Sequence, residues 1–270
     1  MTPTPVAPAD QLSRGPADAR VVWLLLPAYN EAENLPPLLK RVGAAWQGLF
    51  PFHVVVVDDG SADDTASVAL AAGRDGPVEV VRHPRNLGLP AAMRTGVQEV
   101  CRRASDEDVI VTMDADNSHP PELVPSMVAR LQAGSDIVIA SRFVQGGREE
   151  GVAWTRRLWS RGARIVFSVL FPIPGVRDYT TGFRAYRAAV LKALCAEYGE
   201  RVIEAGAFSV MTELLLKARA HTSQVSEVPL VLRYDLKQGP SKMKLGKTLR
   251  DYGRLILRER RPRKGKTFPC

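Results

Sequence analysis

The chain has 270 residues, of which 45% are hydrophobic and 24% are charged, and its formal net charge is +8. These values are ordinary for a soluble globular protein with one large core or two modest domains. The three cysteines, Cys101, Cys195 and Cys270, are odd in number and lack metal-ligand spacing. This argues against a disulfide framework or a zinc site and favours a reducing, cytoplasmic compartment.

Residues 1–20 are rich in Pro, Ala and Asp and have no apolar signal-peptide core, so we expect a disordered lead-in. No stretch of the chain approaches the roughly 18 uninterrupted apolar residues of a membrane-spanning helix. The sequence therefore argues against an integral membrane protein.

Continuous apolar runs of strand length recur in the first half, with helical patterns between them. The runs lie at residues 21–26, 53–57, 78–82, 109–113 and 136–140. Helix-start signals predict helices from Asn30 to about Trp46, over residues 64–74 and over residues 122–132. Because the runs do not alternate with polar residues, both faces of the strands should be covered, as in a mainly parallel, doubly wound sheet. Ligands of such sheets bind beyond the carboxyl ends of the strands.

The pattern becomes helix-rich after Gly146-Gly147. It predicts helices over residues 154–171, 185–197 and 208–220, and a returning strand over residues 225–234. No linker is long enough to divide the chain into independent units. We therefore predict a catalytic domain over residues 21–235, preceded by the segment 1–20 and followed by a lid loop, a basic amphipathic helix and a tail over residues 236–270.

Positive charge is concentrated near the C-terminus. Residues 247–266 contain nine basic and two acidic side chains, and apolar residues recur among them at near-helical spacing. Such a helix would either rest on anionic lipid as a peripheral membrane contact or pack its apolar face on the core. Nucleic-acid binding is not expected, because aromatic residues do not interleave with the basic ones.

Two carboxylates follow the fourth apolar run, in Asp114-Ala115-Asp116, with Asn117 and Ser118 directly after them. Carboxylates at the exit of a buried strand repel each other unless a cation or several donors lie between them. Hard oxygen ligands with room for substrate phosphates suit Mg²⁺ or Mn²⁺. An ordinary turn at a strand end is the alternative, since Asp and Asn are common there.

Further polar motifs follow the other strands. Pro27-Ala28-Tyr29-Asn30-Glu31 ends the first, Asp58-Asp59-Gly60-Ser61 ends the second, and Asn86-Leu87-Gly88 follows the third. Asp58 would accept N–H bonds from a uracil or guanine ring, and Tyr29 offers a surface for stacking. Four strand ends with such motifs are difficult to explain as turns alone.

These motifs, in this order, resemble the inverting, nucleotide-sugar-dependent glycosyltransferases of family 2 over roughly residues 21–232. The resemblance implies an α/β fold of the GT-A (Rossmann-like) type, with a mainly parallel central sheet and flanking helices. In the second half, residues 140–144, 160–163, 178–184 and 241–243 resemble polyprenyl-phosphate (dolichol-phosphate) mannose synthases. Those enzymes join a hexose from a nucleotide sugar, GDP-mannose or a UDP-hexose, to a polyprenyl phosphate.

The resemblance also implies roles for individual residues. The metal would be held by Asp116 first, with Asp114 and Ser118; some relatives carry Gln at the position of Ser118. The predicted nucleotide-sugar-binding residues are Pro27, Tyr29, Glu31, Asp58, Asn86, Gly88, Asp114, Asp178 and Arg184. The predicted catalytic residues are Asp114, Asp116, Arg142, Arg161 and Lys242.

An acceptor phosphate is already anionic at neutral pH, so it must be captured rather than deprotonated. Guanidinium groups suit this task, and Arg142, Arg161 and Arg184 are the candidates, with Asp178 orienting one of them or the sugar. Lys242 lies in a segment that would close over the diphosphate as a lid. The predicted helix over residues 154–171 would either guide a prenyl chain or belong to the core.

Two other functions stay open at the level of sequence. A family 2 transferase with a hydroxyl acceptor would need a carboxylate base, for which Asp178 and Glu213 are the candidates. A non-catalytic nucleotide-sugar-binding subunit, tethered by its basic tail, is the second alternative. The Asp114 and Asp116 pair argues against it, because a binding module need not keep both carboxylates.

Overall fold

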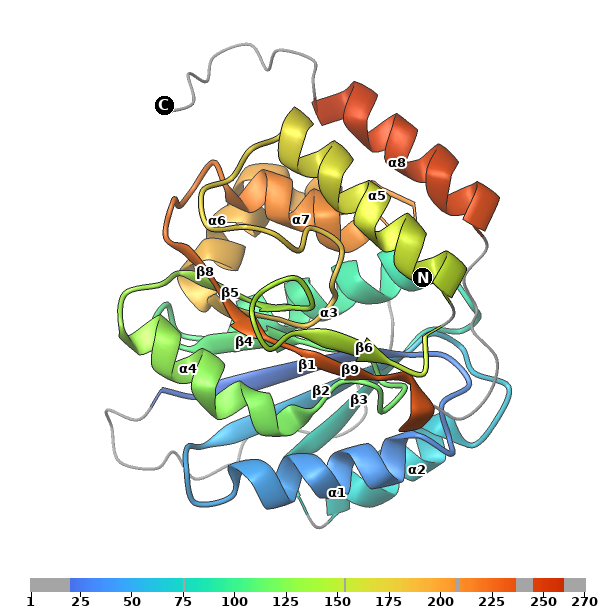
Figure 1. Ribbon diagram of the computed structural model, residues 1–270. Coiled ribbons are helices and arrows are strands. Elements are labelled where there is room, and N and C mark those ends of the chain that lie inside the picture. The colour runs from blue at the N-terminus through green and yellow to red at the C-terminus, as the bar shows by residue number, and fades with distance from the viewer. Residues whose placement is uncertain (1–19, 75, 153, 207–208, 237–244, 260–270) are drawn as a thin grey trace.

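The computed structural model describes residues 20–74, 76–152, 154–206, 209–236 and 245–259 (Figure 1). Its centre is a seven-stranded sheet with the order β3-β2-β1-β4-β7-β5-β8. The strands are β1 (Val22–Ala28), β2 (Phe52–Asp58), β3 (Val78–Arg82), β4 (Val109–Thr112), β5 (Ile137–Ser141), β7 (Arg184–Arg187) and β8 (Val225–Pro229). Strand β7 runs antiparallel to its neighbours β4 and β5, and the other pairs are parallel. The mainly parallel sheet predicted from the continuous apolar runs is confirmed.

Helices cover both faces of this sheet in Figure 1. One face carries α1 (Leu35–Trp46), α2 (Thr65–Arg74) and α4 (Val124–Gln132), and the other carries α3 (Leu89–Arg103), α6 (Ala188–Tyr198) and α7 (Val210–Ala218). Helices α5 (Trp154–Leu170) and α8 (Leu245–Glu259) form an outer layer over the second face. Short 3₁₀ turns are η1 (Pro121–Leu123), η2 (Gly199–Val202) and η3 (Tyr234–Leu236).

Two hydrophobic clusters fill the spaces on either side of the sheet, because successive side chains of a strand point to opposite faces. Leu24 and Leu26 of β1 belong to the cluster beneath α1 and α4, whereas Trp23 and Leu25 belong to the one beneath α3, α6 and α7. Leu255 of α8 also belongs to the second cluster. The basic helix therefore packs an apolar face on the core, one of the two arrangements expected from its sequence.

The structure corrects three details of the predicted elements. Residues 185–187, predicted as helical, belong to β7, which is inserted between β4 and β5. The single strand predicted over residues 225–234 is two strands, and the second, β9 (Val231–Arg233), pairs with β6 (Arg148–Glu150) in a separate two-stranded sheet. Helix α3, which the sequence pattern did not predict, begins with Pro90 in its first turn, where the missing N–H costs nothing.

Across the described ranges, no helix combines the length and the apolar character that crossing a bilayer requires.

Candidate active site

The predicted motifs share one edge of the sheet, because β1, β2 and β4 are parallel and adjacent. In the strand register Ala28 of β1 lies beside Asp58 of β2, and Leu25 lies beside Thr112 of β4. The segments that follow these strands therefore leave the sheet side by side. This edge is where ligands of doubly wound sheets bind.

Side-chain to backbone hydrogen bonds join the loops after β1 and β2. The N–H of Asn30 donates to Ser61 Oγ at 2.9 Å, and the N–H of Ala62 donates to Asn30 Oδ1 at 2.9 Å. Asn30 adopts a left-handed backbone with φ of 50°, which Asn tolerates better than most residues. Tyr29 is half-buried beside this junction, and Glu31 is buried with its Oε2 accepting from Asn34 Nδ2 at 2.8 Å.

Asp58 is fully buried at the end of β2. Its Oδ1 accepts the N–H of Ser61 at 3.0 Å, and its Oδ2 lies 3.0 Å from Nε of Arg82 in an ion pair. That contact lacks the geometry of a hydrogen bond, so Oδ2 has no hydrogen-bond partner among the described residues. The Arg82 side chain is 58% exposed, so the ion-pair partner of this buried carboxylate reaches solvent.

Asp59, which the sequence reasoning did not select, fixes the loop that contains Asn86 and Gly88. Its carboxylate accepts the N–H groups of Leu87 at 2.9 Å and Gly88 at 2.7 Å, and it lies 2.7 Å from His83 Nδ1. Gly60 has φ of 67°, and a Cβ there would lie 2.3 Å from the carbonyl carbon of Arg85. Asp59, the first residue after β2, thus holds the loop that follows β3.

The acidic pair after β4 is held by its own turn. Asp116 is 6% exposed, and its Oδ1 accepts the N–H of Ser118 at 3.1 Å and the Ser118 hydroxyl at 2.6 Å. Asp114 is exposed, and its N–H donates to Nδ1 of His119 at 3.2 Å. His119 in turn stacks on Phe183, with ring centroids 5.2 Å apart. His119 is a second residue that the sequence reasoning missed, because only the fold shows its contact with the backbone of Asp114.

Gly182 packs against the Asp114 side chain, and a Cβ at this position would lie 3.2 Å from Asp114 Oδ1. Among the residues that the structure describes, no group of three or more His, Cys, Asp or Glu side chains could enclose a metal. The donor set is thus two carboxylates beside an open edge, with the Ser118 hydroxyl hydrogen already donated to Asp116. This set fits Mg²⁺ or Mn²⁺, which take oxygen ligands and complete their shells with substrate phosphates and water.

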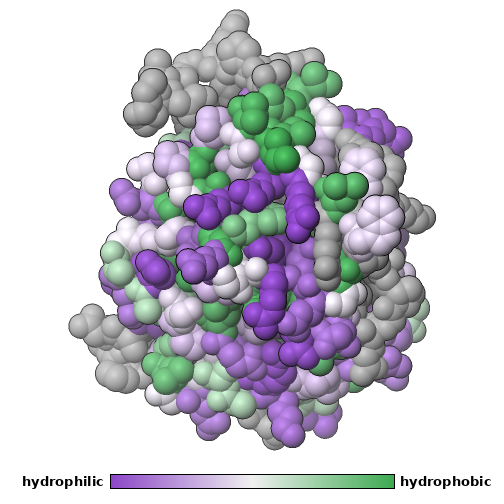
Figure 2. Space-filling view, viewed as in Figure 1, coloured by the Kyte–Doolittle hydropathy of each residue, from purple (hydrophilic) through white to green (hydrophobic). Residues whose placement is uncertain are grey.

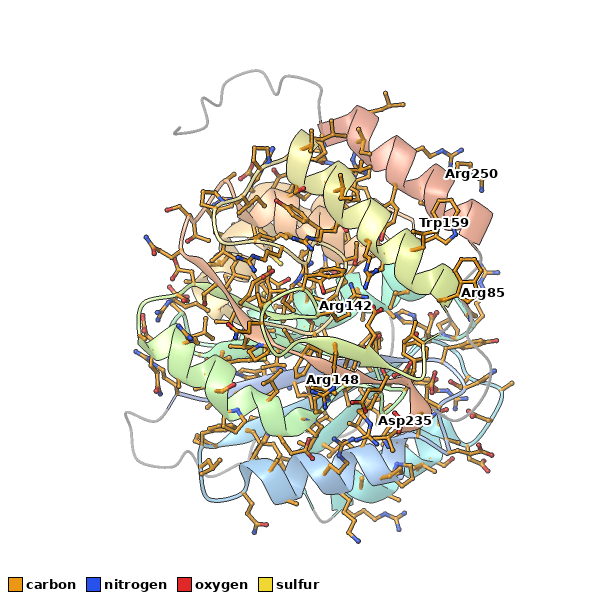
Figure 3. All side chains as sticks on the ribbon, viewed as in Figure 1. Arg85, Arg142, Arg148, Trp159, Asp235 and Arg250 are labelled. Carbon is orange, nitrogen blue, oxygen red and sulfur yellow. The ribbon has the colours of Figure 1, made fainter. Side chains whose placement is uncertain are left out.

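Arg142 follows β5 directly, is labelled near the middle of the view in Figure 3, and has a side chain that is 12% exposed. Its Nε and Nη2 donate to the two oxygens of Asp178, each at 2.8 Å, and Nη1 donates to Glu149 at 3.0 Å. Nη2 also donates to Thr180, so four of the five N–H groups of Arg142 are committed. Burial alone would raise the pKa of the Asp178 carboxyl, but the charge and hydrogen bonds of Arg142 hold that pKa below its ordinary value.

Three other predicted residues have different surroundings. Arg184 has no exposed surface, and its guanidinium donates to the backbone carbonyls of Tyr179 and Met211. Arg184 was predicted to bind the nucleotide sugar or the acceptor phosphate, and β7 places it in the core. Arg161 is exposed on α5. Lys242 lies outside the described residues.

Glu213, a candidate general base in the hydroxyl-acceptor alternative, is fully buried in α7. It lies 2.8 Å from Lys217 Nζ, pairs with Arg258 of α8, and accepts the N–H groups of Glu204 and Ala205 at 2.9 and 2.6 Å. This carboxylate therefore joins α7, α8 and the segment between α6 and α7. It does not face an open cleft.

Comparison with known proteins places these features in context. The model of the family described as "Glycosyl transferase family 2" matches residues 23–195. The chain is 38% identical over 238 residues to a dolichol-phosphate mannosyltransferase of Pyrococcus furiosus, a match that covers 88% of this chain and 63% of the relative. It is 34% identical over 222 residues to a polyprenol monophosphomannose synthase of Mycolicibacterium smegmatis, covering 82% of this chain and 80% of the relative.

A solved structure has the same fold. Glucosyl-3-phosphoglycerate synthase from Mycobacterium tuberculosis, in complex with Mn²⁺ and UDP-glucose, superposes with a TM-score of 0.66 at 22% sequence identity. The match covers 92% of this chain and 82% of that chain.

Proposed function

The chain belongs to glycosyl transferase family 2 and has the GT-A fold. On that premise we propose that it transfers the hexose mannose from a nucleoside diphosphate sugar to a polyprenyl phosphate. The observation that carries the proposal is the meeting of Asp114-Ala115-Asp116 with the motifs after β1, β2 and β3 at one sheet edge. The names of the two relatives support mannose and a polyprenyl phosphate acceptor. The match spans 63% of the length of the relative from Pyrococcus furiosus, so the activity in that relative's name is a proposal for this chain.

Asp116 and Asp114 would hold Mg²⁺ or Mn²⁺, which when bound neutralises the charge that grows on a departing diphosphate. The Ser118 hydroxyl orients Asp116 by donating to its Oδ1. His119 holds the backbone of Asp114 by accepting its N–H at Nδ1. The Mn²⁺ and UDP-glucose in the structure of the M. tuberculosis enzyme are compatible with this assignment.

The donor nucleoside would lie along the loops after β1 and β2, beside Tyr29, and Asp58 would accept an N–H of the base once Arg82 moves aside. Asp59 keeps the loop of Asn86 and Gly88 in place by accepting its backbone N–H groups. Transfer requires an oxygen of the acceptor phosphate to attack the anomeric carbon in line as the nucleoside diphosphate leaves, which inverts the configuration. Orienting the two substrates supplies most of the rate in such a reaction.

The acceptor side favours an anion over a hydroxyl. A hydroxyl acceptor needs a carboxylate base within hydrogen-bonding reach. The two candidates, Asp178 and Glu213, are both fully buried and bound to arginine side chains. An acceptor phosphate needs no base, and Arg161 on α5 is an exposed guanidinium that can approach it. Arg142 is bound to Asp178 and Thr180, so its role would be to position the segment that contains these two residues.

We further propose that α5 and α8 rest on an anionic lipid surface, where a polyprenyl acceptor would reside. Figure 2 shows hydrophobic residues gathered over α5, and the exposed ones include Leu158, Ile165 and Val169, at 61%, 62% and 72%. Their neighbour α8 exposes Arg250 and Arg254. Apolar burial and attraction to anionic headgroups act together at such a surface.

Vesicle sedimentation tests this contact. The full chain should sediment with vesicles of phosphatidylserine and phosphatidylcholine, and Ile165→Asp with Val169→Asp should release it. Leu70→Asp is the matched control, because Leu70 is 49% exposed on α2, on the other face of the sheet. If the α5 variant and the control bind the vesicles equally well, α5 does not contact the lipid surface.

The transfer itself is tested with the purified full chain, Mg²⁺ or Mn²⁺, a polyprenyl phosphate and radiolabelled GDP-mannose or UDP-glucose. Label in the organic phase is the expected result. Label only in a water-soluble glycoside would favour a hydroxyl acceptor. Absence of label in both, with the nucleotide sugar still bound, would favour a binding subunit.

A further inference from the structure

Two thiols that the proposed function does not use lie where α3 packs against α6. Cys101, in the last turn of α3, is 8% exposed, and Cys195 of α6 is partly exposed. Both are free thiols, and their side chains are hydrogen-bonded to each other. Cys101 belongs to the hydrophobic cluster beneath these helices, and Cys195 packs against the same cluster. Two cysteines far apart in the sequence are therefore in contact in the fold.

Hydrogen bonds on both sides of this pair fix the two segments relative to each other. On one side Lys192 Nζ donates to the carbonyl oxygen of Ala104 at 3.2 Å, and on the other Gln98 Nε2 donates to Glu200 Oε1 at 3.0 Å. In each contact a residue before one cysteine meets a residue after the other. The two segments therefore run antiparallel, and the thiols lie between two contacts that hold them face to face.

The two sulfur atoms have different surroundings. The hydrogen bond from Cys101 lowers the pKa of the Cys195 thiol. The same hydrogen bond and burial raise the pKa of the Cys101 thiol. The S–H of Cys101 therefore donates to the Cys195 sulfur, which is the more exposed of the two. Because the thiolate is the form that reacts with oxidants, Cys195 is the sulfur that an oxidant meets first.

We propose that Cys101 and Cys195 form a redox modification site, at which hydrogen peroxide converts the two thiols into an intramolecular disulfide between α3 and α6. The Cys195 thiolate attacks one oxygen of the peroxide, the O–O bond breaks and hydroxide leaves, which gives a sulfenic acid. The Cys101 sulfur then bonds to the Cys195 sulfur, the S–O bond breaks, and the departing hydroxide takes the Cys101 proton to form water. Two electrons pass from the sulfur atoms to the peroxide, and a small dithiol returns them.

The pair would make oxidation of this interface reversible. A sulfenic acid with no thiol beside it is oxidised further to a sulfinic acid, which dithiols do not reduce, whereas a neighbouring thiol converts it to a disulfide. Cys101 is also far from the donor loop, because it lies roughly 18 Å along the axis of α3 from Leu89 at the ordinary rise of an α-helix. The bond would thus protect the thiols without a direct contact with the candidate active site.

Peptide mapping of the folded full chain tests the proposal, with Cys270→Ser as the parent so that only two thiols remain. The parent is treated with hydrogen peroxide, blocked with N-ethylmaleimide and digested with trypsin without a reductant. Peptides 95–102 and 193–201 should appear linked, two hydrogens lighter than their sum. Dithiothreitol should then restore both thiols. Loss of the thiols as sulfinic acids, with no linked peptide, would overturn the proposal.

The matched control moves one thiol by a single position, as Cys195→Ala/Ala196→Cys in the same parent. Ala196 is exposed and lies about 100° further around α6, so the number of thiols is kept but their contact is lost. The yield of linked peptide should fall roughly 10-fold or more, because a disulfide requires the two Cβ atoms to approach each other. Equal yields from the parent and the control would show that the packing of α3 on α6 does not direct the bond.

Cys101→Ser tests the order of the two steps. Serine keeps a hydrogen-bond donor beside Cys195 but forms no disulfide, so peroxide should carry Cys195 to a sulfinic acid that dithiothreitol does not reverse. If dithiothreitol restores the Cys195 thiol as fully in this variant as in the parent, Cys101 does not protect Cys195 and the proposal is wrong.

The melting temperature of the oxidised parent shows whether the folded state accepts the bond. A disulfide that closes a long loop restricts the unfolded chain, so oxidation should raise the melting temperature by about 5 °C or more relative to the reduced parent. A lower melting temperature after oxidation would mean that the bond forces α3 and α6 apart, which contradicts a pair preset by their packing.

Discussion

The two halves of the molecule treat their charged side chains in opposite ways. At the edge formed by β1, β2 and β4, Asp114 is exposed and Asp116 lies in a short turn beside it. Behind α5 and α8, Arg142, Arg184 and Glu213 are bound inside the protein by partners from distant parts of the chain. The first arrangement places carboxylates at the edge of the sheet where ligands bind, and the second uses charge to hold the fold together. Substitutions at the sheet edge should therefore reduce activity, and substitutions behind α5 and α8 should reduce stability.

The largest effect is expected from Asp116→Asn. Asn keeps the oxygen that accepts from Ser118, so the turn should survive, but the charge that would hold the metal is lost. We expect kcat for sugar transfer to fall by about 10³-fold with little change in melting temperature. Asp64→Asn, at an exposed position before α2, is the control. A variant that keeps a tenth of the wild-type rate would mean that Asp116 is not a metal ligand.

The second prediction moves to the other half, where Lys217→Met should affect stability rather than chemistry. Lys217 is 1% exposed, lies 2.8 Å from Glu213, and donates to the carbonyls of Arg201 and Val202 at 2.6 and 3.2 Å. Removing the ammonium group weakens a buried ion-pair network and takes the Lys217 donor from the carbonyls of Arg201 and Val202, although Arg258 still pairs with Glu213. We therefore expect unfolding in urea to require about 3 kcal/mol less free energy.

Lys192→Met provides the contrast, because Lys192 pairs with the exposed Asp106 and such surface pairs contribute about 1 kcal/mol or less. Transfer activity of Lys217→Met, measured well below its melting temperature, should be near that of the wild type. Equal losses of stability in the two lysine variants would show that the Glu213 network does not hold α8 and α7 together.

The same contrast explains what the sequence could and could not predict. The motifs after β1, β2, β3 and β4 were predictable, because each is a short segment at a strand end and parallel pairing brings such ends together. The position of Arg184 was not, since it depends on β7 being inserted between β4 and β5, and nothing local in residues 184–187 marks a strand. The roles of Asp59 and His119 also required the fold, as their partners are backbone groups that a sequence pattern does not show.

The smallest effect concerns the dependence of stability on pH. Arg142 lowers the pKa of the Asp178 carboxyl, so ionised Asp178 stabilises the fold above its unfolded pKa of about 3.9, and this contribution is lost as pH falls through the lower, folded value. Asp178→Asn should therefore be less stable than the wild type at pH 7, and the difference should shrink below about pH 4.

Glu227 should show the opposite sign, because burial raises the pKa of its carboxyl and the folded state prefers the protonated form. Its Oε1 accepts the N–H groups of Arg177 and Asp178, each at 2.7 Å, and Gln preserves this acceptor. Relative to the wild type, Glu227→Gln should be at its most stable near pH 7 and lose that advantage as Glu227 becomes protonated. Urea unfolding at pH 7, 5, 4 and 3 measures both variants. Each variant is compared with the wild type by its free energy of unfolding. If these two differences change with pH in the same direction, the ion pair with Arg142 is not the cause of the opposite pKa shifts of Asp178 and Glu227.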